Sequence, residues 1–293
     1  MDQATSVPIR LVSLNIRVDT PRLFPGEKPW SVRCPKLCAQ LDFITRGIDN
    51  VFLCLQEATQ RQIDEINANL STNWTYIGRG RDDGKKGGEF CPIFYRHNYW
   101  TCKWSETLWL SETPKQPSRS WDSSLNRIVT VGKFEHKQSG THAIFMNTHL
   151  DHHGPIARLK SAQFLVDLAN KGCADDYVRN IKLVPVFLAG DFNSTPDSDV
   201  YKTLTAPDSG LYDLSHRLGA ERRYGHRDIT YTSFGQEQCR RIDYLFTTRE
   251  PKNVIVMGFG VLPNVFDDKV YLTDHRPVVA DIEILPLLDK PVQ

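Results

Sequence analysis

Short apolar runs that each end in a polar side chain are the feature of this 293-residue chain that most constrains its fold. Four of these runs, VSLN, VFLCLQE, IFMNTH and VFLAGD, end at Asn15, Glu57, His149 and Asp191. Their length and their content of Val, Ile and Phe predict buried β-strands. Burying the polar ends is costly unless they share partners. We therefore expect the strands to bring these side chains together at one site.

Apolar patterning predicts a single layered domain. Runs rich in Val, Ile and Phe predict strands at residues 8–16, 51–56, 74–78, 90–95, 127–134, 142–149, 183–190, 242–248, 254–261 and 277–284. Single apolar stripes predict helices at 33–48, 59–70, 157–170 and 197–205. We expect a four-layer α/β/β/α sandwich, with two mixed β-sheets packed face to face and helices outside. The domain would span residues 1–293, with its core at about 8–284.

Composition narrows the class of protein. The chain is 40% hydrophobic and 24% charged, with a formal charge of +1, which is ordinary for a globular protein and low for an electrostatic nucleic-acid binder. We find no transmembrane run and no secretory leader, although a leader that had been removed would leave no trace. Seven scattered cysteines favour reduced thiols over a disulfide framework. We expect a cytoplasmic protein with no obligate protein partner, and a secreted form stays open.

The run LAGDFNSTP places Asp191 and Asn193 two residues apart after a strand, where the preceding glycine permits close backbone approach. These residue types also favour turns, so the motif alone leaves both interpretations open.

Glu57 ends a run that is otherwise apolar, which makes it a candidate metal ligand. Its alternative role is a charge at the start of the next helix. With help from Asn15 and Asp274, Glu57 supplies the oxygen ligands that suit Mg²⁺, or Mn²⁺ in its place.

Two histidines are candidates for proton transfer. His149 ends a strand, and His275 follows Asp274 in YLTDHRPV. An imidazole can exchange protons near neutral pH when a carboxylate holds its other nitrogen, and Asp243 in RIDYLF is the carboxylate we would pair with His275. The alternative for Asp243 is a buried ion pair with one of the two preceding arginines.

The segment HRLGAERRYGHR (216–227) is rich in arginine. It is either a solvated charged loop or a phosphate-contacting loop, since arginine suits bidentate phosphate binding. We therefore take Arg223, His226 and, in the run LNRIVT, Arg127 as candidates for substrate binding.

Taken in order, these motifs resemble the endonuclease/exonuclease/phosphatase superfamily, which includes pancreatic-type deoxyribonuclease, apurinic endonucleases, deadenylases, inositol-polyphosphate 5-phosphatases and neutral sphingomyelinases. The resemblance covers roughly residues 8–284. The motifs that carry it are LNIR, LQE, NTHLDH, GDFNSTP, RIDYLF and TDHRPV.

The resemblance implies roles for the catalytic residues. His149 would contact the scissile phosphate, and His275 would work with Asp243. Asp191 and Asn193 would align or deprotonate the attacking water and stabilise the transition state.

The same resemblance implies a metal site and a support for the first histidine. Asn15 and Glu57 look like a metal-site pair, and Asp274 like a metal-site or phosphate-site carboxylate. Glu89 is similar to the family carboxylate that supports the first histidine, with Tyr95 nearby, and we take both as contributing to substrate binding.

These roles imply single-step, in-line attack of water on a phosphate ester, assisted by Mg²⁺. We favour a small or nucleotide-like phosphomonoester or phosphodiester as substrate. The alternative is an endonuclease or 3′-exonuclease, deadenylase-like, on single-stranded or structured nucleic acid. A phospholipid or sphingomyelin phosphodiesterase and a non-catalytic scaffold are further readings that the motifs support less.

Overall fold

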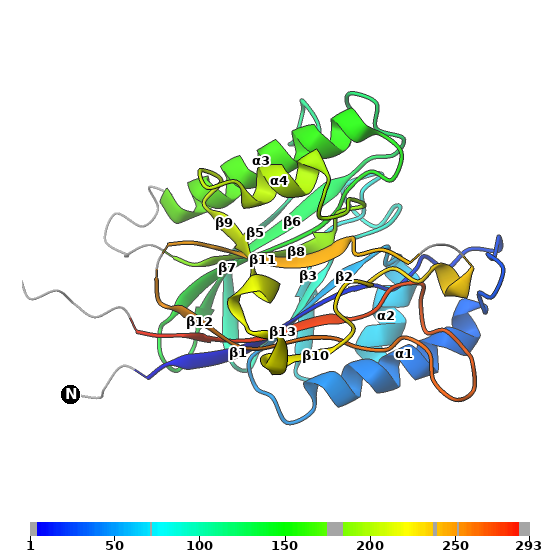
Figure 1. Cartoon of the computed structure of the whole chain (residues 1–293), viewed down its shortest axis with the longest axis horizontal. Coiled ribbons are helices and arrows are strands. Elements are labelled where there is room, and N and C mark those ends of the chain that lie inside the picture. Colours follow the sequence, from blue (N-terminus) through cyan, green and yellow to red (C-terminus); the bar gives the residue numbers. More distant parts are fainter. Residues whose placement is uncertain (1–4, 71, 175–183, 237–238, 251, 287–293) are drawn as a thin grey trace, which may run out of the picture.

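The computed structural model describes residues 5–70, 72–174, 184–236, 239–250 and 252–286. Two β-sheets pack face to face, and helices cover the outer face of each sheet (Figure 1). The four-layer α/β/β/α arrangement expected from the sequence is therefore confirmed. Within the described residues, no helix combines the length and the apolar character needed to cross a membrane.

The first sheet has seven strands and contains the N-terminal strand. In spatial order its strands are β10 (Arg223–Gly225), β12 (Val254–Val261), β13 (Val278–Ile284), β1 (Val7–Asn15), β2 (Val51–Gln56), β4 (Ile93–Arg96) and β3 (Trp74–Ile77). The central strands β1 and β2 are parallel, and β13 runs antiparallel to β1. The sheet is therefore mixed, as expected.

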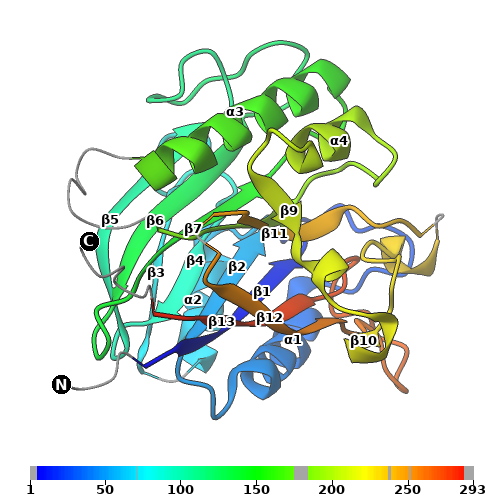
Figure 2. The same ribbon diagram turned by 60° about the vertical axis from the view of Figure 1, so that its left-hand side comes forward.

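The second sheet has six strands. In spatial order these are β5 (Trp100–Trp109), β6 (Ile128–His136), β7 (His142–His149), β8 (Val186–Asp191), β11 (Asp243–Thr248) and β9 (Leu211–Asp213). The strands β7 and β8 are parallel, and β11 is antiparallel to β8. Figure 2, turned by 60° from Figure 1, shows the helices α3 and α4 over this sheet.

Four α-helices form the outer layers, with α1 (Trp30–Thr45) and α2 (Gln60–Asn69) on the first sheet and α3 (Pro155–Ala174) and α4 (Asp199–Thr205) on the second. The helix α2 begins with a capping box, in which Thr59 accepts from the backbone N–H of Gln62 and the Gln62 side chain accepts from the backbone N–H of Thr59. This cap fixes the chain immediately after Glu57.

Three hydrophobic layers hold the sandwich together. Between the sheets, the rings of Phe52 and Phe145 stack with centroids 3.6 Å apart. Leu37 and Ile63 belong to the layer under α1 and α2, and Leu165 belongs to the layer under α3. These layers make both sheets rigid supports for side chains at the strand ends.

The structure also corrects several sequence-based boundaries. The strand β5 was not expected, because its first half is largely exposed and lacks a continuous apolar run. The short strands β9 and β10 were also missed, and β10 lies within a segment expected to be a loop. The helix α1 begins and ends about three residues earlier than its apolar stripe suggested.

Strand register brings the polar strand ends together. Asn15 lies opposite Gln56, the residue before Glu57, in the parallel pair β1–β2. In the other sheet, Asp191 lies opposite both His149 on β7 and Asp243 on β11. Both sets lie at the same end of the sandwich, where the Asn15 side chain forms hydrogen bonds with Glu57 and Asp191.

Candidate active site

Asn15 connects the two halves of the site. Its side-chain amide nitrogen donates to Glu57 Oε1 at 2.9 Å and to Asp191 Oδ2 at 3.0 Å. Its side-chain oxygen accepts from the backbone N–H of Arg17 at 2.9 Å. Asn15 is fully buried, so this amide orients two carboxylates that belong to different sheets.

Asp191 lies at the centre of the cluster. Burial raises its pKa to about 7, and the neighbouring Asp243 carboxylate adds to this effect, while His275 opposes it. Asp191 Oδ1 accepts from the backbone N–H of Asn193 at 2.9 Å, and Asp191 Oδ2 lies 3.4 Å from His149 Nε2. A carboxylate in this setting can accept a proton near neutral pH.

Asn193 positions His149. The backbone of Asn193 is left-handed, with φ of 48°, and its amide nitrogen lies 3.0 Å from His149 Nε2 and 3.0 Å from the Leu150 carbonyl oxygen. Burial, together with the charge of Arg127, lowers the pKa of His149 well below its usual value, so this imidazole is neutral. His149 Nδ1 is buried without a hydrogen-bond partner among the described residues.

His275 is held by Asp243, as the sequence suggested. Its Nδ1 lies 2.9 Å and 3.0 Å from the two Asp243 oxygens, and its Nε2 lies 3.6 Å from Asp191 Oδ2. Burial alone would lower its pKa, but Asp243 and Asp191 outweigh burial and raise it to about 10. His275 therefore carries positive charge beside the Asp191 carboxylate.

Glu57 and Asp274 form a second acidic region. Burial opposes ionisation of Glu57, but the charge of Arg17 and a hydrogen bond from the backbone of Val18 lower its pKa. Burial, together with repulsion from Glu57, raises the pKa of Asp274. A cation between these two carboxylates would offset their repulsion and lower the pKa of Asp274.

These donor atoms fit a hard divalent cation. Glu57 and Asp274 offer carboxylate oxygens, the ligands that Mg²⁺ prefers. Ligand atoms of Asp191, Asp243 and His275 also lie within 4.8 Å of one another. That second group is a weaker candidate for a metal site. His275 Nδ1 is hydrogen-bonded to Asp243, and a protonated imidazole has no lone pair for a metal.

Two arginines and a carboxylate lie next to His149. Arg127 and Arg81 line a small crevice together with Glu89 and His149. Arg127 is buried, with its Nε 3.4 Å from Asp151 and its Nη2 2.9 Å from His152 Nδ1. These contacts hold a positive charge beside His149.

The structure gives Glu89 a different partner from the one expected. Both of its oxygens accept from Arg81, at 2.7 Å and 2.9 Å, so it does not support His149 directly. Burial and the charge of Glu57 raise the pKa of Glu89 to about 7. Sequence reasoning missed Arg81. Its only signal was its place in the irregular stretch 79–89, which also contains Glu89.

The other three expected substrate-binding residues have different surroundings. The prediction for Tyr95 was wrong, because its ring is buried between the sheets, edge-on to Phe134. Arg223 lies on β10 over the ring of Phe259. His226 is exposed just after β10, where partial burial and the charge of Arg276 lower its pKa.

Part of the arginine-rich segment contributes to a different hollow. Arg217 and Arg222 line a separate hollow of about 710 Å³ with Arg249 and Lys252. This hollow lies at the opposite end of β11 from Asp243, because Arg249 follows the last residue of that strand.

The site combines clustered carboxylates with two histidines in different protonation states, and arginines lie nearby. This combination is typical of a hydrolytic site for phosphate esters. The model of the endonuclease/exonuclease/phosphatase family matches residues 12–275, and the chain belongs to this family. Family members are metal-dependent enzymes that hydrolyse phosphate esters, as nucleases or phosphatases, and this chain is therefore an enzyme of that kind.

Solved structures support the same family. An endonuclease/exonuclease/phosphatase protein from Bacteroides vulgatus is 30% identical, with a TM-score of 0.81 over 95% of this chain and 100% of that chain. A mannosyl-6-phosphatase from Bacteroides thetaiotaomicron is 28% identical, with a TM-score of 0.78 over 94% of this chain and 99% of that chain.

Curated relatives are more distant and longer. Human Nocturnin is 24% identical over 95% of this chain, which spans 66% of the Nocturnin sequence. The 3′-5′-exoribonuclease subunit Ccr4 of Saccharomyces cerevisiae is 20% identical over 91% of this chain and 37% of its own length. The chain therefore matches only part of each of these proteins.

Proposed function

We propose that this protein is a Mg²⁺-dependent phosphoesterase that hydrolyses a small or nucleotide-like phosphate ester by direct attack of water. The observation that carries the proposal is the linkage made by Asn15, which connects the Glu57 region to Asp191 at hydrogen-bond distance. A carboxylate region suited to a cation thereby lies next to a carboxylate suited to accept a proton. In-line hydrolysis of a phosphate ester needs both.

Glu57 and Asp274 would hold the cation, with Asn15 orienting Glu57. When bound, Mg²⁺ neutralises negative charge on the phosphate and on the leaving oxygen. Mn²⁺ would satisfy the same oxygen ligands. The repulsion between the two carboxylates, which raises the pKa of Asp274, supports this assignment.

Asp191 would orient the attacking water and accept its proton. The protonated His275 lies 3.6 Å from the same Asp191 oxygen and would stabilise the negative charge on the phosphoryl group. Asp243 keeps His275 charged and fixes the direction of its ring. The water oxygen would form the new bond to phosphorus as its proton passes to Asp191. The P–O bond to the leaving group would break, and the leaving oxygen would take a proton from solvent.

His149, oriented by Asn193, would bind a phosphoryl oxygen. His149 is neutral, so one ring nitrogen can donate to an oxygen of the substrate. Arg127, next to His149, would bind the same phosphate electrostatically. We keep Arg127 and Glu89 as residues that shape substrate binding and leave Tyr95 out.

The mannosyl-6-phosphatase at 28% identity supports a small phosphomonoester as substrate. The second candidate is a nuclease, because relatives include the 3′-5′-exoribonuclease subunit Ccr4. The net charge of +1 weakens this candidate, since binding to a nucleic-acid backbone favours a basic surface.

The free thiols of the described cysteines also support the proposed cytoplasmic location.

A substrate panel tests the proposal. Phosphomonoesters, phosphodiesters, nucleotides and short oligonucleotides would be incubated with Mg²⁺, with Mn²⁺ and with EDTA. We expect release of inorganic phosphate from small monoesters with either ion and none with EDTA. Shortening of the oligonucleotides without phosphate release would favour the nuclease, and activity that persists in EDTA would contradict the proposal.

A further inference from the structure

An exposed histidine contacts the arginine that lies next to His149. His152 is in the loop between β7 and α3, and its Nδ1 lies 2.9 Å from Arg127 Nη2. Arg127 is only 4% exposed, whereas His152 is exposed to solvent. His152 is also close enough to both His149 and Glu57 to interact with them electrostatically. It therefore lies beside the catalytic cluster, on the side that solvent reaches.

The contact with Arg127 determines which nitrogen of His152 carries the proton. A guanidinium can only donate, so His152 Nδ1 accepts from Arg127, and the proton of the neutral ring is on Nε2. Partial burial lowers the pKa of His152, and the charges of Arg127 and His153 add to this effect, so the ring is neutral at neutral pH. Its Nε2–H has no hydrogen-bond partner among the described residues and can donate to a ligand.

Hydrogen bonds hold the loop that carries His152. Asp151 Oδ1 accepts from the backbone N–H groups of His153 and Gly154, at 2.9 Å and 2.8 Å. The Arg158 guanidinium donates to the backbone carbonyl of Asp151 at 2.9 Å. These bonds fix the backbone before and after His152, so a ligand would meet a donor that is already in position, at little cost in ordering.

The crevice lined by Arg127 and His149 is too small for a phosphate group. Its volume of about 10 Å³ leaves room for at most one water molecule. Within the described part of the chain, Arg127 uses Nε and Nη2 for Asp151 and His152, and its Nη1 forms no hydrogen bond. A phosphate bound by Arg127 would therefore lie at the mouth of the crevice, where His152 is exposed.

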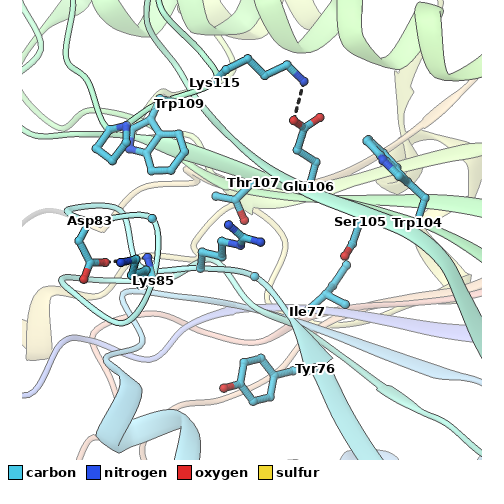
Figure 3. Close-up of a pocket in the computed structure, with 14 residues that line it drawn as sticks. Tyr76, Ile77, Asp83, Lys85, Trp104, Ser105, Glu106, Thr107, Trp109 and Lys115 are labelled. Atoms are coloured by element: carbon cyan, nitrogen blue, oxygen red, sulfur yellow. Dashed lines mark hydrogen bonds and ion pairs between the residues drawn. The ribbon is translucent and has the colours of Figure 1, made fainter.

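Trp109 closes one side of this crevice. It packs with Cys91 and Ile128, which line the crevice, and its indole N–H donates to the Arg81 carbonyl at 2.7 Å. Its other side lines a separate hollow of about 660 Å³ between the edge strands β3 and β5 (Figure 3). Because Trp109 lies between the two spaces, a substrate would reach Arg127 from another side.

We propose that His152 selects a phosphomonoester as substrate, by donating its Nε2–H to the terminal phosphate oxygen that carries the second ester group in a diester. A monoester offers one more terminal oxygen than a diester and more negative charge beside Arg127. An alkyl group on that oxygen would remove the charge and collide with the imidazole, whose position the loop fixes. This inference rests on the proposed phosphoesterase function and names the substrate class of the same site.

Kinetics on two substrates that differ by one methyl group test the role of His152. The substrates are p-nitrophenyl phosphate and methyl p-nitrophenyl phosphate, which share a leaving group. We expect His152→Ala to lower kcat/KM for the monoester about tenfold and to change that for the diester less than about twofold, because only the monoester loses a hydrogen bond. Equal losses on both substrates, or no loss on the monoester, would overturn the proposal.

Two further variants separate direct contact with the substrate from positioning of Arg127. His152→Asn keeps an acceptor near the place of Nδ1 but lacks the Nε2–H donor, so it should behave like His152→Ala. His152→Gln carries an amide N–H toward the place of Nε2 and should recover part of the activity on the monoester. Wild-type activity in His152→Asn would show that His152 acts only through Arg127, and would contradict the proposal.

His97→Ala is the matched control, because His97 is an exposed histidine that follows β4. In the antiparallel pair β2–β4, Tyr95 lies opposite Phe52, near the start of β2, whereas Glu57 follows the end of β2. His97 therefore lies at the end of the first sheet away from the catalytic cluster, and its substitution should change neither substrate.

A binding experiment separates this inference from the proposed function. Calorimetry would measure the dissociation constant of inorganic phosphate, with Mg²⁺ present, for the wild type and for His152→Ala. We expect the variant to bind phosphate about tenfold more weakly. If neither ester is hydrolysed but this difference is found, the proposed function fails and the phosphate contact of His152 stands. If the wild type does not bind phosphate, or both proteins bind it equally, the role of His152 is wrong.

Discussion

His275 Nδ1 lies 2.9 Å from Asp243 Oδ2, although 32 residues separate the two along the chain. Both side chains are buried, so this contact is not weakened by solvent. It fixes the ring of His275 with its other nitrogen toward Asp191, at 3.6 Å. The orientation of the charged imidazole toward the reacting phosphate thus depends on Asp243.

We expect His275→Ala to lower kcat by roughly 10²–10⁴-fold, because the substitution removes the charge that faces the phosphoryl group. Folding should be preserved, since the small side chain leaves the hydrophobic layers untouched. Phosphate release would measure kcat, and circular dichroism would verify the fold. Near-normal turnover in a folded variant would remove His275 from the mechanism.

Glu57→Gln tests the cation site. The substitution removes one carboxylate charge while keeping the side-chain size, so binding of Mg²⁺ should weaken roughly 10–100-fold, with a lower maximal rate. A titration of activity with Mg²⁺ measures both quantities. Glu112→Gln, at an exposed position, is the matched control. An unchanged Mg²⁺ requirement would exclude Glu57 as a ligand.

Gly190 lies where the two parallel strands that carry His149 and Asp191 approach each other. A Cβ at this position would lie 2.3 Å from the carbonyl oxygen of Thr148, a backbone atom that cannot move without shifting β7. We expect Gly190→Ala to cost about 1–3 kcal/mol of unfolding free energy and to lower turnover. Chemical unfolding measures the first effect, and phosphate release measures the second.

Gly258→Ala is the control for this substitution, since a Cβ there would make only ordinary contacts with Asp281. Equal stability of the two variants would show that the approach of β7 and β8 tolerates a methyl group.

Asp151 stabilises the chain beside Arg127. Burial alone would raise its pKa, but hydrogen bonds from Gly154 and Ser124 and the charge of Arg127 hold it well below its usual value. The pKa of Asp151 is lower in the folded than in the unfolded state, so the ionised carboxylate stabilises the folded protein at pH values above its unfolded pKa of about 4. This stabilisation is lost as the pH falls further.

We therefore expect Asp151→Asn to lower the unfolding free energy by about 1–3 kcal/mol at neutral pH. The difference in unfolding free energy between wild type and variant should shrink below about pH 4, where the stabilising effect of the ionised wild-type carboxylate begins to be lost. Urea unfolding at several pH values measures this difference. A constant difference across that range would contradict the assignment of the effect to the ionised carboxylate.

Much of the fold followed from local patterns. The strands ending at Asn15, His149 and Asp191 were predicted because short apolar runs and β-branched residues act over a few neighbouring positions. Trp100–Trp109 was missed as a strand because half of it faces solvent, and only its pairing with β6 defines it.

The sequence alone determined which residues end the strands, and therefore which polar groups must find partners away from water. Only the tertiary structure decided which partners these are: Glu89 pairs with Arg81, and Tyr95 packs inside the core. A hollow between β3 and β5 also exists only because the edges of two sheets meet there. Such contacts depend on strand register and on how the sheets stack, and these are set by residues far apart in the chain.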